Sequence, residues 1–162
     1  MADVLVTWYS RSGSTERVAR ALAGRLGADA RPIVSSASYA GAGGFARGIW
    51  ESLRRRAPDI RIDVDPGAYR LVVVGGPIWA GKPATPLRAF LRRYGPRTRS
   101  VAAFCVSGAG GAWPAAFAEI EDLVGGPLAA RLSLSQAEAL GPGLPAALDG
   151  FARELSGVRS AR

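Results

Sequence analysis

The sequence predicts a doubly wound α/β fold, in which a parallel sheet of five strands lies between two layers of helices. Two observations lead to this prediction. Apolar segments typical of strands alternate with segments of helical periodicity along the chain. The clearest strand, 71–75, is apolar at every position, which indicates burial on both faces, as in the middle of a parallel sheet. With 162 residues, of which 48% are hydrophobic, and no repeat or long linker, the chain is expected to form one domain.

The first half of the chain contains two predicted strands and two predicted helices. An apolar run from Val4 to Tyr9 predicts the first strand, and apolar residues at helical spacing from Val18 predict a helix after it. Residues 30–34 predict a weaker strand near an edge of the sheet, because Pro32 interrupts it. Residues 35–44 are rich in Ser, Gly and Ala and predict a loop. The next helix is expected to end near residues 57–58, with a core-facing stripe of Phe45, Ile49, Trp50 and Leu53.

The second half of the chain continues the alternation of strands and helices. After the strand at 71–75, residues 83–94 predict a helix that begins with Pro83. Residues 101–106 predict another buried strand, which leaves Cys105 in the core without a chemical role. A helix with Phe117 on its apolar face follows, and residues 127–134 are expected to supply the fifth strand. The last helix has an apolar stripe of Leu144, Leu148, Phe151 and Leu155.

The composition excludes several kinds of site. The chain has no histidine and one cysteine, which excludes an internal disulfide, a cysteine-rich metal centre and a nucleophile–histidine pair. We expect no metal site and no catalytic side chain, and any chemistry must come from carboxylates, a lysine or a bound cofactor. The formal net charge is +8, but the arginines are scattered apart from Arg54, Arg55 and Arg56, which fit a solvated helix end better than a nucleic-acid site. The absence of a long apolar run or a leader predicts a cytoplasmic protein without a membrane span.

Ligands of doubly wound sheets bind at the carboxyl ends of the strands, where three loops of this chain have unusual compositions. The first is the loop of residues 10–15. It places four hydroxyl groups and the backbone N–H groups of a helix start around one point, which suits a phosphate. Gly13 lets the backbone pass close to such a ligand. The same residue types also occur in ordinary turns and N-caps, so the composition alone leaves that alternative open.

The second loop, residues 76–83, nearly matches the phosphate loop of nucleoside triphosphatases. Pro83 occupies the position of the essential hydroxyl, and Pro77 lacks an N–H group, so we exclude that activity. Trp79 lies between small residues and suits stacking on a planar ring, although it could instead fold onto the adjacent helix. The third loop, residues 107–114, lacks the last glycine of the dinucleotide-binding pattern because residue 113 is Trp.

The three loops together resemble those of the flavodoxin family. Residues 10–15 match its pattern Ser/Thr-x-Ser/Thr-Gly-x-Thr, and residues 75–81 match Gly/Ser-x-Pro-x-Trp/Tyr-x-Gly. The resemblance implies a short-chain member with strand order 2-1-3-4-5. It also implies that FMN is bound, with its phosphate on the first loop, its ring against the second and the polar edge of the ring at the third. Trp113 could either cover the ring or simply anchor the next helix. The cofactor-binding residues implied are Ser10, Arg11, Ser12, Gly13, Ser14, Thr15, Pro77, Ile78, Trp79, Ala80, Gly81, Lys82, Ser107, Gly108, Ala109, Gly110, Gly111 and Trp113.

The resemblance implies electron transfer or an FMN-dependent oxidoreductase activity, for example reduction of quinones by NAD(P)H. The partner would be a redox protein or a small electron acceptor, and a homodimer is compatible with the sequence. The alternative is a binding or regulatory module that has the fold but has lost the cofactor. Typical flavodoxins are acidic, whereas this chain is basic, with Arg11 and Lys82 in two of the loops. Because nearby cations stabilise an anionic reduced flavin, we expect a higher two-electron potential than in acidic carriers.

Overall fold

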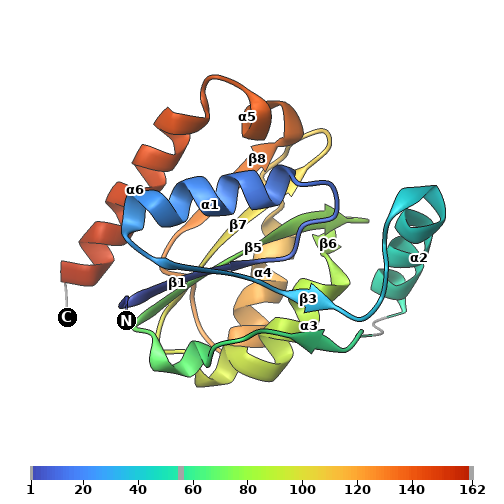
Figure 1. The fold of residues 1–162 in the computed structure, drawn as a ribbon, viewed down its shortest axis with the longest axis horizontal. Coiled ribbons are helices and arrows are strands. Elements are labelled where there is room, and N and C mark those ends of the chain that lie inside the picture. Colours follow the sequence, from blue (N-terminus) through green and yellow to red (C-terminus); the bar gives the residue numbers. More distant parts are fainter. Residues whose placement is uncertain (1, 55–56, 161–162) are drawn as a thin grey trace.

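The computed structural model of the chain describes residues 2–54 and 57–160, and has a central sheet between two layers of helices (Figure 1). The strands of the sheet are β1 (Val4–Trp8), β2 (Asp29–Pro32), β5 (Leu71–Trp79), β6 (Lys82–Pro83), β7 (Val101–Ser107) and β8 (Arg131–Ser135). The short strands β3 (Val34–Ser35) and β4 (Ile60–Arg61) form a separate antiparallel pair. The helices are α1 (Ser14–Leu26), α2 (Gly41–Leu53), α3 (Thr85–Tyr94), α4 (Pro114–Val124), α5 (Gln136–Leu140) and α6 (Leu144–Ser160).

The order of the parallel strands is β2-β1-β5-β7-β8, which confirms the predicted doubly wound topology. β5 lies in the middle, where Val73 pairs with Val6 of β1 and with Ala102 of β7. Both faces of these strands are covered, so their residues are apolar without alternation. β2 is an edge strand, which accommodates Pro32 because no further strand needs its missing N–H group.

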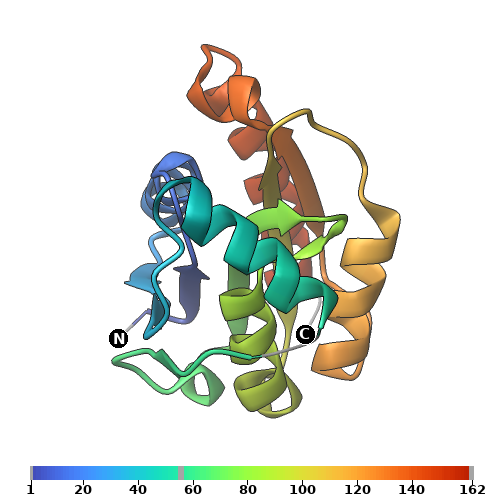
Figure 2. The same cartoon turned by 90° about the vertical axis from the view of Figure 1, so that its right-hand side faces the viewer.

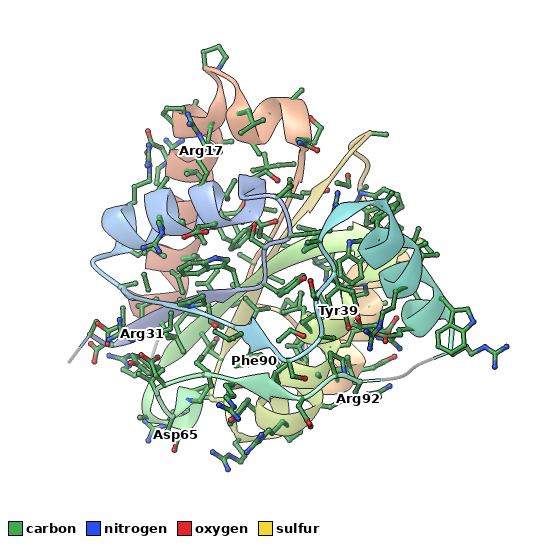
Figure 3. All side chains as sticks on the ribbon, turned by 45° about the vertical axis from the view of Figure 1, so that its right-hand side comes forward. Arg17, Arg31, Tyr39, Asp65, Phe90 and Arg92 are labelled. Atoms are coloured by element: carbon green, nitrogen blue, oxygen red, sulfur yellow. The ribbon has the colours of Figure 1, made fainter. Side chains whose placement is uncertain are left out.

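Two apolar cores lie on the two sides of the sheet (Figure 2). On one side, Val4, Val6 and Trp8 of β1 pack with buried residues of α1, α5 and α6. On the other side, buried residues of α3 and α4 pack with Leu5 and Tyr9. Figure 3 shows Tyr39 and Phe90 among the side chains of this second core. None of the helices in the described ranges is long and apolar enough to span a lipid bilayer.

The boundaries of two predicted elements are wrong in an informative way. β5 does not end at Gly75 but continues to Trp79, and β6 then returns beside it, so that the predicted second loop is a β-hairpin. Pro83 therefore belongs to β6, and α3 begins two residues later with Pro86 in its first turn. Glycine and proline at 75–77 suggest a loop, but β7 still pairs with this segment as far as Pro77.

α2 also differs from its prediction. It ends at Leu53, and two residues of its expected core-facing stripe are exposed, Phe45 at 39% and Trp50 at 43%. The side chain of Leu53, and the Arg55 and Arg56 of the arginine run, lie outside the described residues. α5 is not predicted by the sequence pattern. It is short, and a capping box of Ser135 and Glu138 fixes its start, with reciprocal hydrogen bonds of 3.1 and 2.7 Å.

Candidate functional site

The register of the sheet brings the three predicted loops together at one edge. Trp8 of β1 pairs with Gly75 of β5, and Gly75 in turn pairs with Phe104 of β7. The segments that follow these strands are residues 10–15, the β5–β6 hairpin and residues 108–113, so all three emerge side by side. This is the edge at which doubly wound sheets bind ligands.

The loop of residues 10–15 leaves the start of α1 available to a ligand. Gly13 is the N-cap residue, with a φ of 97° that favours glycine, and no side chain caps the helix. The Gly13 N–H donates to Ser10 Oγ at 3.0 Å, which leaves the Ser10 hydroxyl proton free to donate. The hydroxyls of Ser12 and Ser14 have no hydrogen-bond partner among residues 2–54 and 57–160. Backbone and side-chain donors thus surround the positive end of the helix dipole.

The β5–β6 hairpin presents its tip at the same edge. Its turn residues Ala80 and Gly81 have φ values of 50° and 74°, as the tight turn between Trp79 and Lys82 requires. Ala80 is exposed, and Pro77, Ile78, Gly81 and Lys82 are half-buried. Since Lys82 has no ion pair within the described part of the chain, its ammonium group contributes an uncompensated positive charge to this edge.

Trp79 does not have the open ring face that stacking on a ligand requires. Its side chain is 2% exposed and lies in a cluster of aromatic rings, at 5.8 Å from Tyr9 and 5.0 Å from Tyr39, measured between ring centroids. α2 covers the indole where Gly48 leaves room for it. This corresponds to the alternative interpretation, a tryptophan folded onto a helix, although the helix is α2 and not the one that follows the hairpin.

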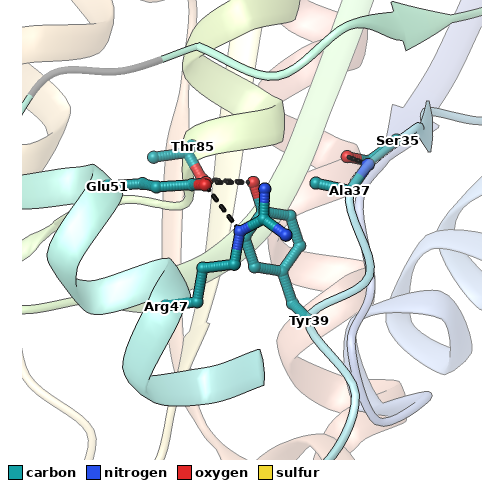
Figure 4. A network of polar contacts seen from close by, with 6 residues as sticks. All are labelled: Ser35, Ala37, Tyr39, Arg47, Glu51 and Thr85. Atoms are coloured by element: carbon teal, nitrogen blue, oxygen red, sulfur yellow. Dashed lines mark hydrogen bonds and ion pairs between the residues drawn. The ribbon is translucent and has the colours of Figure 1, made fainter. Parts of the chain in front are cut away.

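A buried polar network fixes the helix that covers Trp79 (Figure 4). The Tyr39 hydroxyl donates to Glu51 Oε2 at 2.6 Å, and the Thr85 hydroxyl lies 3.3 Å from the Tyr39 oxygen. Arg47 Nε donates to Glu51 Oε1 at 2.7 Å, so the buried carboxylate is neutralised. Burial, followed by the hydrogen bond to Glu51, raises the pKa of Tyr39 to about 12. The network joins α2 to the start of α3, directly behind the hairpin.

The sequence did not reveal this network, because Tyr39 lies in a segment that resembles a loop. The one signal available was Glu51, which lies beside an apolar stripe in the sequence. If this helix packs on the sheet, the carboxylate of Glu51 requires a buried hydrogen-bond or ion-pair partner.

Trp113 holds the third loop, residues 107–114, in place. Its indole Nε1 donates to Ser107 Oγ at 3.0 Å, and Gly111 leaves room for the ring, since a Cβ there would lie 3.2 Å from it. The Ser133 hydroxyl of β8 donates to the carbonyl of Gly111. Trp113 is also the N-cap of α4, so it anchors both the loop and the helix. Gly108 and Ala109 remain exposed, and because Gly108 has no side chain and Ala109 only a methyl group, a ligand can approach their backbone.

Comparison with solved structures identifies the fold. A flavoprotein from Lactobacillus acidophilus, solved in complex with FMN, superposes with a TM-score of 0.69 at 20% identity, over 94% of this chain and 99% of that one. A putative flavoprotein from Bacteroides uniformis gives 0.75 at 19%, over 92% and 97%. Oxidised flavodoxin 2 from Bacillus cereus gives 0.60 at 16%, over 96% and 99%.

The comparisons of sequence are negative. No family model matches the chain, and no curated protein does. The strand order, the three loops at one edge and the superpositions over nearly the whole length agree with the resemblance noted in the sequence, and the chain therefore has the flavodoxin-like fold.

Proposed function

We propose that the protein binds FMN and acts in electron transfer or as an FMN-dependent oxidoreductase. The observation that carries this proposal is the uncapped start of α1, where Ser10, Ser12 and Ser14 surround free backbone donors. It lies beside two further loops, as a ligand with a phosphate and an extended ring would require. The flavoprotein of Lactobacillus acidophilus, which shares the fold, binds FMN, and this supports the same cofactor here.

The residues of the first loop would hold the phosphate. Backbone N–H groups and hydroxyls donate to its oxygens, and the helix dipole favours its negative charge. Arg11 is exposed and has no ion pair within residues 2–54 and 57–160, so its guanidinium is available to the same group. The carboxylate of Glu16 in the first turn of α1 opposes an anion, but Arg20 pairs with it at 2.8 Å.

The hairpin and the third loop would hold the ring. Because Trp79 is buried under α2, the contribution of the hairpin is its backbone and the exposed edge from Pro77 to Lys82, and not the face of the indole. Gly108 and Ala109 offer backbone groups to the polar edge of the ring. When bound, FMN supplies the redox chemistry, and the protein orients it and sets its potential. Lys82 and Arg11 would add positive charge to the surroundings of the cofactor, which would favour an anionic reduced flavin.

The buried position of Trp79 favours one alternative, a module that has the fold without the cofactor. In that case α2 and the aromatic rings of Tyr9, Tyr39 and Trp79 would be a permanent part of the core. Flavin binding separates the two functions, since the module would bind neither FMN nor riboflavin.

A charge placed in the first loop tests the proposal. Ser12→Glu adds a carboxylate at the expected phosphate position, where repulsion should weaken FMN binding on the order of 100-fold. Riboflavin has no phosphate, so its affinity should change little. Ser36→Glu is the matched control, because Ser36 is exposed and lies near Asp59 and Arg93, at the far end of α3. Equal losses of FMN and riboflavin affinity in Ser12→Glu would contradict the assignment of the phosphate to this loop.

A further inference from the structure

α2 covers Trp79, the aromatic side chain of the β5–β6 hairpin. It lies at the margin of the molecule, beside the end of β5 (Figure 1). The indole is 2% exposed, and Gly48 of α2 lies directly against its six-membered ring. While α2 remains in this position, a flavin ring can meet only the edge of the hairpin.

The sequence of α2 gives this helix little stability of its own. Four of its 13 residues are glycine, which disfavours a helix relative to alanine at each position. A helix of this length is also too short to be stable in isolation. The position of α2 therefore depends on its contacts with the rest of the fold, and a ligand that competes for those contacts can displace it.

The contacts on the indole leave it without a parallel aromatic partner among the rings that surround it. The ring of Tyr39 is tilted by 54° to the indole and that of Tyr9 by 85°. From α2, the residue against the indole is Gly48, which contributes backbone and no side chain. A planar ring that stacks on Trp79 would replace this glycine contact by a more favourable aromatic one.

The Tyr39 hydroxyl links α2 to α3. It donates to Glu51 Oε2 of α2 at 2.6 Å, and the Thr85 hydroxyl of α3 lies 3.3 Å from its oxygen (Figure 4). The ion pair between Glu51 and Arg47 lies within α2 and does not tie this helix to another element. Loss of the one hydroxyl therefore breaks a link that holds α2 in place.

Arg11 connects α2 to the loop that would hold the phosphate. Its guanidinium carbon is 5.0 Å from the centroid of the Phe45 ring of α2. A phosphate in the first loop attracts the same guanidinium. Binding of the phosphate would thus weaken one contact of α2 while the ring competes for another.

We propose that α2 is a lid, and that FMN binding moves it off Trp79 so that the flavin ring stacks on the indole. This inference rests on the proposed function. It adds an open arrangement to the closed one, in which only the edge of the hairpin meets the ring. Because FMN binds the open form more tightly, its measured affinity is reduced by the fraction of molecules that are closed.

Variants that weaken the closed form test the proposal, because they should bind FMN more tightly although they are less stable. Gly48→Ala forces α2 away from Trp79, and Tyr39→Phe removes the link to α3. Each should lower the dissociation constant of FMN, measured by calorimetry, at least about fivefold, and should also lower the thermal unfolding midpoint. Gly43→Ala is the matched control on α2, since a Cβ there has nothing within 4 Å, and it should change the dissociation constant less than about twofold.

Hydrogen exchange of the wild-type protein tests the movement itself. FMN should slow amide exchange in the first loop, where the phosphate would bind. It should speed exchange in α2, because a displaced helix loses the contacts that stabilise it. Slower exchange in both segments would show that α2 stays closed over a bound flavin, and would overturn the proposal. This measurement also decides the question if a variant does not fold.

The outcomes distinguish failure of the lid from failure of the proposed function. If FMN binds, but Gly48→Ala and Tyr39→Phe leave its affinity unchanged or weaken it, the lid is wrong and the flavin site stands. If neither the wild-type protein nor the variants bind FMN, the proposed function fails and the lid fails with it. Binding by the variants alone would support both, with the wild-type protein held in its closed form.

Discussion

The indole of Trp79 lies directly against Gly48 of α2, so closely that a Cβ at residue 48 would be 2.8 Å from its Cζ3 atom. The contact joins the hairpin to the helix that covers it. A glycine in the middle of a helix is normally unfavourable by about 1 kcal/mol relative to alanine, and here the close approach of the two elements explains it.

Gly48→Ala should therefore lower the free energy of unfolding, although alanine is the better helix former. Displacement of the indole or of α2 should cost about 1–3 kcal/mol, as in other overpacked cores. Gly43→Ala is the matched control on the same helix, because a Cβ there has nothing within 4 Å, and it should be neutral or stabilising. Urea unfolding measures both. A stabilising effect of Gly48→Ala would show that α2 does not lie on Trp79.

Gly75 gives a second prediction, in the centre of the sheet. A Cβ at this position would lie 2.0 Å from Cζ of Phe104, its partner on β7. Gly75→Ala should lower the free energy of unfolding by about 2–3 kcal/mol, through overpacking. Combining it with Phe104→Leu, which shortens the side chain, should cost less than the sum of the two single changes. Additive effects in this double-mutant cycle would mean that the ring does not lie over residue 75.

The pKa of Tyr39 predicts how stability depends on alkaline pH. Burial and the hydrogen bond to Glu51 raise this pKa from 10.0 to about 12. Below pH 10, both the folded and the unfolded chain keep the proton, and the contribution of the network is complete. Between pH 10 and 12, the unfolded state loses the proton first, so the free energy of unfolding should fall as pH rises.

Cys105 acts in the same direction, because burial raises the pKa of its thiol from 9.0 to about 12. Tyr39→Phe keeps the ring and removes the titrating group, so it should lose stability at neutral pH and show a shallower fall above pH 10. Chemical unfolding at several pH values measures both effects. An unchanged alkaline slope in Tyr39→Phe would indicate that the hydroxyl is not buried in the folded protein.

Lys82 provides a prediction for the potential of a bound flavin. Replacing it by Ala removes a positive charge near the proposed ring site, which should lower the two-electron potential by about 30 mV for each 1.4 kcal/mol of lost attraction. Arg153→Ala, on the distant α6, should leave the potential unchanged. Titration with reference dyes measures both. A potential that does not respond to Lys82→Ala would place the ring elsewhere.

The sequence predicted the strands of the sheet well because burial on both faces leaves a simple signal. β1, β5 and β7 are almost entirely apolar, with Thr7 and Ser107 as the polar exceptions, and few other elements have that pattern. The fifth strand was more difficult, since the structure places β8 at Arg131–Ser135, where Leu134 is buried, Arg131 is exposed and the other three residues are half-buried, without a long apolar run. The strand order followed from the resemblance of the loops, and the register then brought those loops to one edge.

The surroundings of Trp79 could not be predicted, for a physical reason. Phe45 has the helical spacing of a buried stripe with Ile49 and Leu53, and Trp50 lies beside it. Hydrophobic periodicity does not distinguish a core-facing stripe from aromatic rings that are exposed and covered by arginines. Likewise, Pro77 and its neighbouring glycines suggest a loop, but these residues pair with residues of β7, and β5 therefore continues through them. Such features depend on contacts between segments that are distant in sequence.

The visible absorption spectrum of the protein tests FMN binding most directly. The purified chain is mixed with FMN, free flavin is removed by gel filtration, and the spectrum of the protein fraction is recorded together with its flavin content after heat release. Binding predicts a yellow protein with about one FMN per chain, whose flavin bands are shifted from those of free FMN. If the protein fraction stays colourless after mixing with FMN at concentrations well above the micromolar range, the proposed flavin site is contradicted, and the flavodoxin-like fold is the only part of the account that stands.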